Sequence, residues 1–282
     1  MIAGTRALAT RVLGTRGFAG RVLAGRAFAG SRVSVPSGAS GAGGTAVARR
    51  TATLLAVSHG TSSASGQEAV AALVDAVADS MPGRHVAGGF VDVQQPDVPA
   101  SLDALDEGAE AVIVPLLLSA GYHVHVDLVR EAASSERPTR IARALGPDDR
   151  LVDVLVRRLD EAGVTEDDVV VLGAAGSSDA RAVEDCRTVA ARLGERIGRP
   201  VVAAFISAAT PRLEDAVAAA RAAHPGRRIV ISTYLLAPGY FATLARRAGA
   251  DLATRPLLVR GEEPPAELVE IVRDRFLAVD GA

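Results

Sequence analysis

The sequence predicts an α/β protein built from two homologous, doubly wound parallel-sheet domains with a cleft between them. Three observations lead to this fold class. Short apolar segments alternate with amphipathic segments of helical period, a pattern typical of parallel sheets covered by helices. The pattern occurs twice, with a repeat distance of one domain length. Gly-rich turns follow several of the apolar segments, as expected where a buried strand leads into a helix.

The composition narrows the classes of function. The 282 residues carry a net charge of -2 and only 3% aromatic side chains. Neither a basic nucleic-acid surface nor a base-stacking surface is therefore expected. The single cysteine, Cys186, excludes an intrachain disulfide framework and a cysteine-based zinc site, and its place on an apolar helical stripe predicts a core position. No apolar run reaches the roughly 18 residues of a membrane-spanning helix, so stable membrane insertion is not expected.

Residues 1–50 differ from the rest of the chain. They are rich in Arg, Ala, Gly and Val, and the first acidic residue of the chain is Glu68. Three interpretations stay open: an organelle transit peptide, a basic segment that touches an anionic membrane, and a disordered tail or a start codon assigned too early. The segment is left out of the fold prediction.

The first half of the duplicated region covers residues 51–163. Its first strand is TLLAVS, and the turn HGTSSASG at 59–66 follows it. Apolar spacing of three and four residues then predicts a helix over 67–81. Pro147-Asp148-Asp149 is typical of a helix start. The further predicted elements are a strand at 85–91, a helix at 99–107, a strand at 112–119, a helix at 127–134, a short strand at 140–144 and a helix at 151–162.

The second half, residues 167–282, repeats this order. DVVVLGAAGSSDARAVEDC corresponds to LLAVSHGTSSASGQEAV, AFISAATP to GFVDVQQP, and IVISTYLLAPGYF to VIVPLLLSAGYH. The two halves differ at three polar positions that lie at or just past strand ends, where ligands bind in open α/β sheets. The pairs are His59 and Ala175, Asp92 and Ser207, and His123 and Phe241, offset by 116, 115 and 118 residues.

This loss of ionisable side chains from a retained scaffold indicates one functional and one degenerate site. Two imidazoles and one carboxylate are ligands that divalent transition metals accept. A single histidine on a loop is more often a surface residue, and a carboxylate such as Asp92 is also a common turn or cap residue. The matched losses in the second half favour the metal site for His59 and His123.

The segments SHGT, GFVD and VPLLLSAGYHVHVD resemble motifs of the CbiX/SirB-type sirohydrochlorin chelatases of the class II chelatase superfamily, in their long two-domain form. The resemblance covers about residues 51–280. It implies a chelatase-like fold and a lyase-class enzyme that inserts Co2+ or Fe2+ into sirohydrochlorin. The product would serve cobalamin or sirohaem biosynthesis. The resemblance also implies that the enzyme needs its metal substrate but no further cofactor.

The resemblance places the family's two histidines on His59 and His123, and the acidic residue after the second one on Asp127. The acidic ligand of related enzymes would fall on Asp92, which is one methylene shorter than the usual Glu. Thr61 replaces the motif Ser and keeps the hydroxyl. We expect catalysis from His59, His123 and Asp92, with a histidine or Asp92 accepting the pyrrole protons. The expected substrate-binding residues are Gly60, Thr61, Ser62, Tyr122, Asp127 and Arg130.

The remaining histidines are weaker candidates. His125 would share a face with His123 if that segment were extended, which would allow a supporting role. His85 and His224 are expected at the surface. The turn HGTSSASG lacks both GxGxxG and GxxxxGK[ST], which argues against nucleotide binding.

Two other classes of function stay open: a carrier that holds a metal ion or a tetrapyrrole without inserting it, and a duplicated scaffold with incidental histidines. A cytoplasmic location is expected. The choices between cobalt and iron and between the two pathways stay open.

Overall fold

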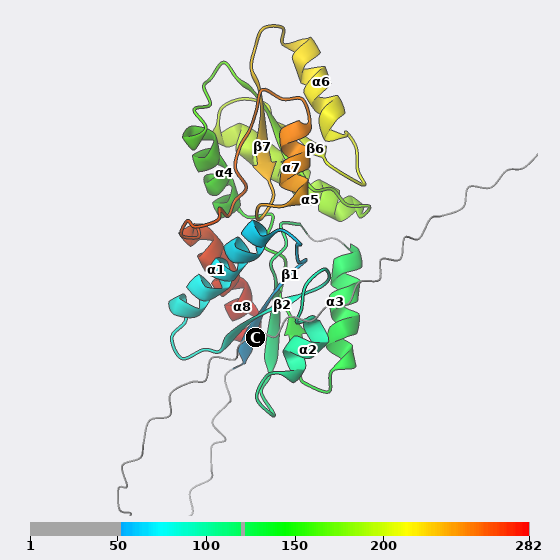
Figure 1. Cartoon of the computed structure of the whole chain (residues 1–282), viewed down its shortest axis with the longest axis vertical. Helices are drawn as coiled ribbons and strands as arrows, with labels where there is room; N and C mark the ends of the chain where they lie inside the picture. Colours follow the sequence, from blue (N-terminus) through cyan, green and yellow to red (C-terminus); the bar gives the residue numbers. More distant parts are fainter. Residues whose placement is uncertain (1–51, 120–121, 282) are drawn as a thin grey trace, which may run out of the picture. The chain divides into compact units, whose positions relative to one another are not determined.

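The computed structural model describes residues 52–119 and 122–281, with the side chains of residues 122–127 left out. The predicted leader, residues 1–50, lies outside this part. Two four-stranded parallel sheets are present, with strand orders β2-β1-β3-β4 and β6-β5-β7-β8 (Figure 1). The strands are β1 Thr53–Ser58, β2 Val86–Phe90, β3 Ala111–Pro115, β4 Thr139–Ile141, β5 Val169–Ala174, β6 Val202–Phe205, β7 Ile229–Tyr234 and β8 Leu252–Ala253.

A helix follows each strand along the chain, so the predicted α/β fold class with two parallel sheets is confirmed. The helices are α1 Ala64–Ser80, α2 Val98–Asp103, α3 Tyr122–Ser134, α4 Asp149–Glu161, α5 Ala180–Arg196, α6 Leu213–Ala223, α7 Tyr240–Arg247 and α8 Ala266–Asp280.

Strand β1 is an inner strand of its sheet, with β2 on one side and β3 on the other, and both of its faces are covered. All six of its residues are buried, as a continuous apolar run predicts. Leu54 pairs with Val86 of β2 on one side and with Val112 of β3 on the other. The carboxyl ends of the three strands therefore meet at one edge, which is where the predicted site residues follow them.

The last helix of each half packs against helices and strands of the other half. Helix α4 follows β4 of the first sheet but packs against α5 and β7 of the second half. Helix α8, at the end of the chain, packs against α1 and β3 of the first half (Figure 1). The described residues of both halves accordingly belong to one compact unit. The limits 51–163 and 167–282 describe the sequence repeat and stay predictions as domain limits.

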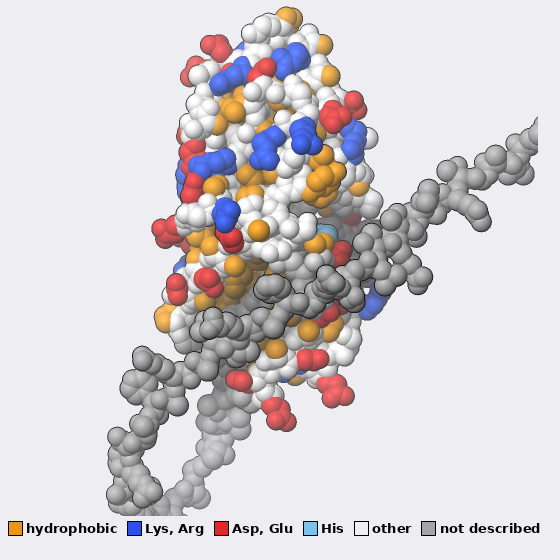
Figure 2. Space-filling model, viewed as in Figure 1, with side chains coloured by type: hydrophobic (Ala, Val, Ile, Leu, Met, Phe, Trp, Pro, Cys, Tyr) orange, Lys and Arg blue, Asp and Glu red, His pale blue; other side chains and the backbone are white. Residues whose placement is uncertain are grey.

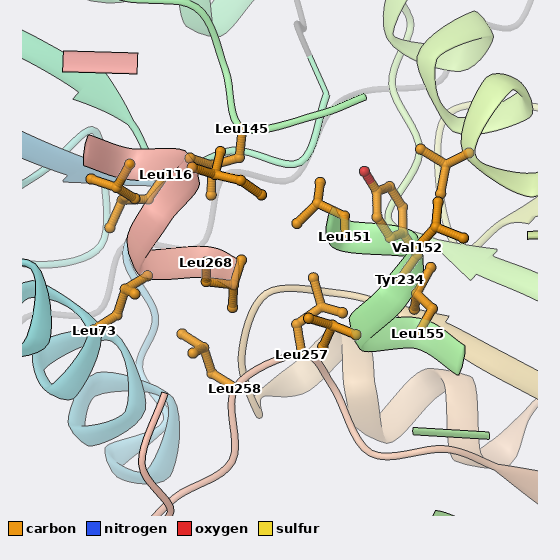
Figure 3. Packing of buried hydrophobic residues seen from close by; sticks show 14 of the residues in the cluster. Leu73, Leu116, Leu145, Leu151, Val152, Leu155, Tyr234, Leu257, Leu258 and Leu268 are labelled. Carbon is orange, nitrogen blue, oxygen red and sulfur yellow. The ribbon is translucent and has the colours of Figure 1, made fainter. Parts of the chain in front are cut away.

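Helices α4 and α8 are thus exchanged between the halves, and one hydrophobic cluster joins the halves where these helices pack. Leu73 of α1, Leu155 of α4 and Leu268 of α8 are all buried in it. Figure 3 shows the cluster extending from Leu73 past Leu268 and Leu257 to Tyr234 and Leu155. Each fully buried leucine stabilises the fold by roughly 2 kcal/mol, so this cluster couples the stability of the two halves. Each half also has a smaller hydrophobic cluster of its own, around Ile113 in the first half and Ile231 in the second.

The backbone of the two halves matches in detail. An isolated bridge joins Phe90 to Asp97 in the first half, and an equivalent bridge joins Phe205 to Arg212 in the second. The duplication predicted from the sequence therefore extends to the loops that follow the strands.

Two element limits differ from the prediction at the stretch before His123. The strand predicted over 112–119 ends at Pro115, because proline has no amide hydrogen to continue the ladder. The helix predicted from residue 127 begins at Tyr122. The interpretation that His125 shares a face with His123 in an extended segment is therefore wrong, since helical positions two apart lie about 200° apart around the axis.

Three predictions about the burial of single residues are confirmed. Cys186 is buried, and His85 and His224 are exposed. Within the described ranges, no helix is both long enough and apolar enough to cross a membrane.

An ion pair at the start of the second sheet gives a pH-dependent contribution to stability. Buried Asp168 accepts hydrogen bonds from Arg228 Nε at 2.9 Å and from the Thr165 backbone N–H at 2.8 Å. The hydrogen bond from Arg228 is the main cause that lowers the pKa of Asp168 from 3.8 to about 2, although burial opposes the shift. The charged carboxylate therefore stabilises the fold above about pH 4, and this contribution disappears as the pH falls towards 2.

We expect Asp168→Asn to lower the free energy of unfolding near neutral pH. The difference from the wild type should shrink as the pH falls from about 4 towards 2, because the wild type then loses the same charge. Denaturant unfolding across this pH range measures the difference, with exposed Asp167→Asn as the control. A difference that stays constant over this range would contradict the assignment.

Candidate active site

His59 is the first residue after strand β1, at the carboxyl edge of the first sheet. His59 is exposed, whereas the six residues of β1 before it are buried. The backbone around it is fixed by the neighbouring strand end, because Asp92 N–H donates to His59 O at 3.1 Å and Val91 N–H donates to Ser58 O at 2.9 Å. A rigid strand end thus presents an accessible imidazole.

The turn after His59 requires glycine. Gly60 has φ +91°, and a methyl group placed on it would lie 2.1 Å from the carbonyl oxygen of Asp92. Gly176 occupies the same place in the second half, with φ +93° and 1.9 Å from the carbonyl oxygen of Ser207. Both a left-handed backbone and a close approach of two loops therefore select glycine at this position.

The backbone of Asp92 lies beside that of His59, but its side chain has a local partner. Asp92 Oδ1 accepts a hydrogen bond from Val93 N–H at 2.7 Å. Val93 follows with φ +64°, an uncommon conformation for a β-branched residue, and Ala208 has φ +54° at the matching place. The exposed Asp92 lines a hollow with Asp97 and Glu131 rather than the pocket that contains His59. The turn role considered for Asp92 is thus present in the structure.

A pocket of about 460 Å³ opens beside His59 and is lined by both halves. The first half contributes the predicted residues Gly60, Thr61 and Ser62. The rest of the described lining is mostly apolar. It includes Leu116, Leu117, Leu118, Leu235, Leu236, Ala237, Pro238, Tyr240 and Phe241. The predicted cleft between the halves is therefore present, and it adjoins the His59 turn.

The second candidate ligand falls outside the described side chains. By their backbone, His123, Tyr122, Asp127 and His125 lie on the first turns of α3, and their side chains lie outside the described part of the structure. Arg130 is exposed on the same helix and is not among the described lining residues of the pocket. In the described part of the chain, no group of three or more His, Cys, Asp and Glu side chains is arranged to hold a metal ion.

Two buried groups in the pocket wall stay protonated. Burial raises the pKa of the Cys186 thiol to about 11, which argues against a thiolate nucleophile at neutral pH. Burial likewise raises the pKa of Tyr234 well above its usual value. Its hydroxyl donates to Leu118 O at 2.8 Å, so a second-half strand end holds the first-half loop that leads towards His123.

Acidic and arginine side chains both reach the surface on the face that Figure 2 shows, and hydrophobic side chains lie between them. Within the described lining of the pocket, His59 is the only residue with a basic side chain.

Gln94 is a residue of this site that the sequence analysis missed. Its Oε1 accepts a hydrogen bond from Thr61 N–H at 2.8 Å, and it lines the pocket. The turn also satisfies its own donors, since Thr61 Oγ1 accepts from Ser63 N–H at 3.1 Å. These two backbone N–H groups are therefore already paired within the protein. The sequence did contain a signal, because the second half has Ala209 at the place of Gln94.

We expect Gln94→Ala to lower the rate of the site's reaction by about tenfold, because the turn that carries His59 loses its link to the next loop. The free energy of unfolding should fall by only about 1 kcal/mol, the net value of one hydrogen bond. Gln94→Glu retains the acceptor atom and should restore most of the rate. Equal rates for Gln94→Ala and the wild type would show that the link does not position the turn.

Solved structures share this chelatase-like α/β fold. SirB from Bacillus subtilis, solved with Fe3+, matches with a TM-score of 0.66 and 21% identity, over 80% of this chain and 94% of SirB. The sirohydrochlorin chelatase SirB from the subspecies spizizenii, in complex with cobalt, matches with a TM-score of 0.60 and 16% identity, over 80% of this chain and 93% of its own. At these identities the likeness establishes the fold.

The sequence itself establishes the family. The model of the CbiX family matches residues 53–162 and 169–246, which is more than half of the chain, so the chain belongs to the CbiX family. A curated relative, a sirohydrochlorin ferrochelatase from Priestia megaterium, is 30% identical over 160 residues. The match covers 53% of this chain and 60% of the relative's length.

Proposed function

We propose that this protein is a sirohydrochlorin chelatase, a lyase-class enzyme that inserts Co2+ or Fe2+ into sirohydrochlorin in cobalamin or sirohaem biosynthesis. One observation carries the proposal. His59 stands at the strand edge beside a pocket shared by both halves, while the second half has the same glycine turn with Ala175 in place of the imidazole. Family membership and the names of the relatives, a ferrochelatase and chelatases solved with Fe3+ and with cobalt, support the reaction.

In this proposal His59 and His123 hold the incoming metal ion through neutral imidazole nitrogens. Because only unprotonated imidazole binds metal, insertion should weaken at acidic pH. Two protein ligands leave coordination positions open, which suits a metal that must move on to the macrocycle. A histidine accepts the pyrrole protons, because Asp92 lines a different hollow and bonds to Val93 N–H. The turn at Gly60, Thr61 and Ser62 contacts the substrate.

We further propose that the metal substrate is the only metal or cofactor required and that the protein works in the cytoplasm. The turn after β1 supports the absence of a nucleotide, since HGTSSASG has neither of the common phosphate-binding glycine patterns. Tyr122, Asp127 and Arg130 are the further substrate contacts that the resemblance to the family suggests.

The second candidate function is a carrier that holds a metal ion or tetrapyrrole without joining the two. The same pocket and imidazoles would serve it, and only turnover separates the two functions. Anaerobic incubation of sirohydrochlorin with Co2+ or Fe2+ and a small amount of protein, followed by absorbance, makes this test.

An enzyme yields many equivalents of metallated product per chain and exceeds the rate without protein. A carrier binds the metal ion or the tetrapyrrole but does not exceed that rate. The metal inserted faster indicates the pathway served.

A further inference from the structure

The pocket wall carries an exposed aromatic pair from the second half. In the described part of the chain, the large hydrophobic side chains that are exposed are Val93, Val129, Val202, Tyr240, Phe241 and Leu277. Three of these six, Val93, Tyr240 and Phe241, line the pocket beside His59. Tyr240 is 72% exposed and Phe241 is 40% exposed. Exposed apolar side chains gathered in one place indicate a binding surface.

Two adjacent aromatic residues are notable in this chain because it has few aromatic residues. Aromatic side chains make up 3% of the sequence, and two of them are adjacent here. The ring centroids of Tyr240 and Phe241 lie 6.2 Å apart, with the planes tilted by 50°. The two rings therefore extend over neighbouring areas of the wall instead of being stacked on each other.

The loop before the pair is held against the turn that carries His59. A methyl group on Gly66 would lie 2.3 Å from the carbonyl oxygen of Pro238, and one on Gly239 would lie 3.3 Å from Thr61 Oγ1. Gly239 also caps helix α7, where its carbonyl accepts from Thr243 N–H at 3.1 Å. The rings are thus placed by packed backbone, which lowers the entropy lost on binding.

The lining suits the flat part of a tetrapyrrole better than its carboxylates. Leucines from both halves line the pocket, and its described lining contains no arginine. A conjugated macrocycle gains from apolar and aromatic contact, whereas carboxylates favour arginine or water. The macrocycle would accordingly enter the pocket, with its carboxylates at the solvent-exposed rim.

We infer that Tyr240 and Phe241 form the platform that binds one face of the tetrapyrrole macrocycle beside His59. This inference rests on the proposed function. It assigns the degenerate half a substrate-binding role, because Phe241 stands where the first half has the candidate ligand His123. The duplicated position has then changed from metal binding to ring binding.

The test is a titration of metal-free sirohydrochlorin into the full chain under anaerobic conditions, followed by fluorescence. The double variant Tyr240→Ala/Phe241→Ala should bind about tenfold more weakly or worse, and its KM for sirohydrochlorin should rise accordingly. Phe241→Tyr keeps a ring and should retain the affinity. Leu277→Ala removes an exposed apolar side chain outside the described pocket lining and is the matched control.

The outcomes distinguish a failure of the aromatic platform from a failure of the proposed chelatase function. Unchanged sirohydrochlorin affinity in the double variant, with metal insertion by the wild type, overturns the platform and leaves the proposed function standing. Weaker binding in the double variant, with no turnover by the wild type, supports the platform but points to a carrier. A wild type that does not bind sirohydrochlorin overturns both. Unchanged affinity together with altered oligomeric state identifies the pair as a contact between chains and also overturns the platform.

Discussion

Replacing Gly60 with alanine is expected to lower the rate of metal insertion by on the order of 100-fold or more. The new methyl group would lie 2.1 Å from the carbonyl oxygen of Asp92, and φ +91° is unfavourable for alanine. The left-handed backbone costs about 1–2 kcal/mol, and relieving the clash costs about 1–3 kcal/mol more. The relief must come from separating the two loops, which displaces the adjacent imidazole of His59.

Gly176→Ala is the matched control in the second half. Its methyl group would lie 1.9 Å from the carbonyl oxygen of Ser207 at nearly the same φ, so its cost in stability should be similar. No imidazole adjoins it, since Ala175 precedes it, and we expect an activity loss below about tenfold. Comparing thermal unfolding and initial rates for the two variants separates stability from positioning. Equal activity losses would contradict a site located in the first half.

Arg158 of α4 and Arg275 of α8 occupy equivalent positions on the two exchanged helices. Replacing either one should lower the stability of the protein more than replacing other side chains of these helices. Arg158 of α4 donates to Pro256 O at 3.1 Å and Leu257 O at 2.8 Å. Arg275 of α8 donates to Ala144 O at 3.0 Å and Leu145 O at 2.9 Å. Each arginine thus fastens its helix to the loop after the last strand of the sheet that the helix covers.

We expect Arg158→Met and Arg275→Met each to lower the free energy of unfolding by about 2–4 kcal/mol. Methionine fills similar space but leaves two carbonyl groups without their charged donor, and such hydrogen bonds contribute about 1.5–3 kcal/mol each. Denaturant unfolding measures the loss.

Arg187→Met is the control, because Arg187 forms an exposed pair with Glu184 and should cost less than about 1 kcal/mol. Losses no larger than that of the control would show that the two arginines do not fasten the helices.

The order of strands and helices was predictable because parallel strands buried on both faces are continuous apolar runs. TLLAVS of β1 shows this directly, and its first-half partner β3 begins with a similar run. The duplication was visible because strand-end motifs recur at nearly constant spacing. The position of His59 at an exposed strand end followed from the same reasoning, since the turn begins where the apolar run stops.

The parts that were not predictable depend on contacts between distant segments. An apolar stripe such as that of α4 shows that a helix is covered but not which sheet covers it, so the exchange of α4 and α8 was missed. The hydrogen bond from Thr61 N–H to Gln94 joins two loops 33 positions apart, and no local pattern indicates it. The start of α3 at Tyr122 was missed because the segment's glycine and its histidines interrupt the helical apolar pattern.

The most direct test of a metal site at His59 is the initial rate of metal insertion into sirohydrochlorin by His59→Ala, with His123→Ala measured beside it. His85→Ala and His224→Ala serve as controls, because both histidines are exposed and neither is in the described pocket lining. We expect the first two variants to lose the activity above the rate without protein, and the two controls to keep the wild-type rate. A wild-type rate in His59→Ala, with the fold intact, would contradict a metal site at the edge of the first sheet.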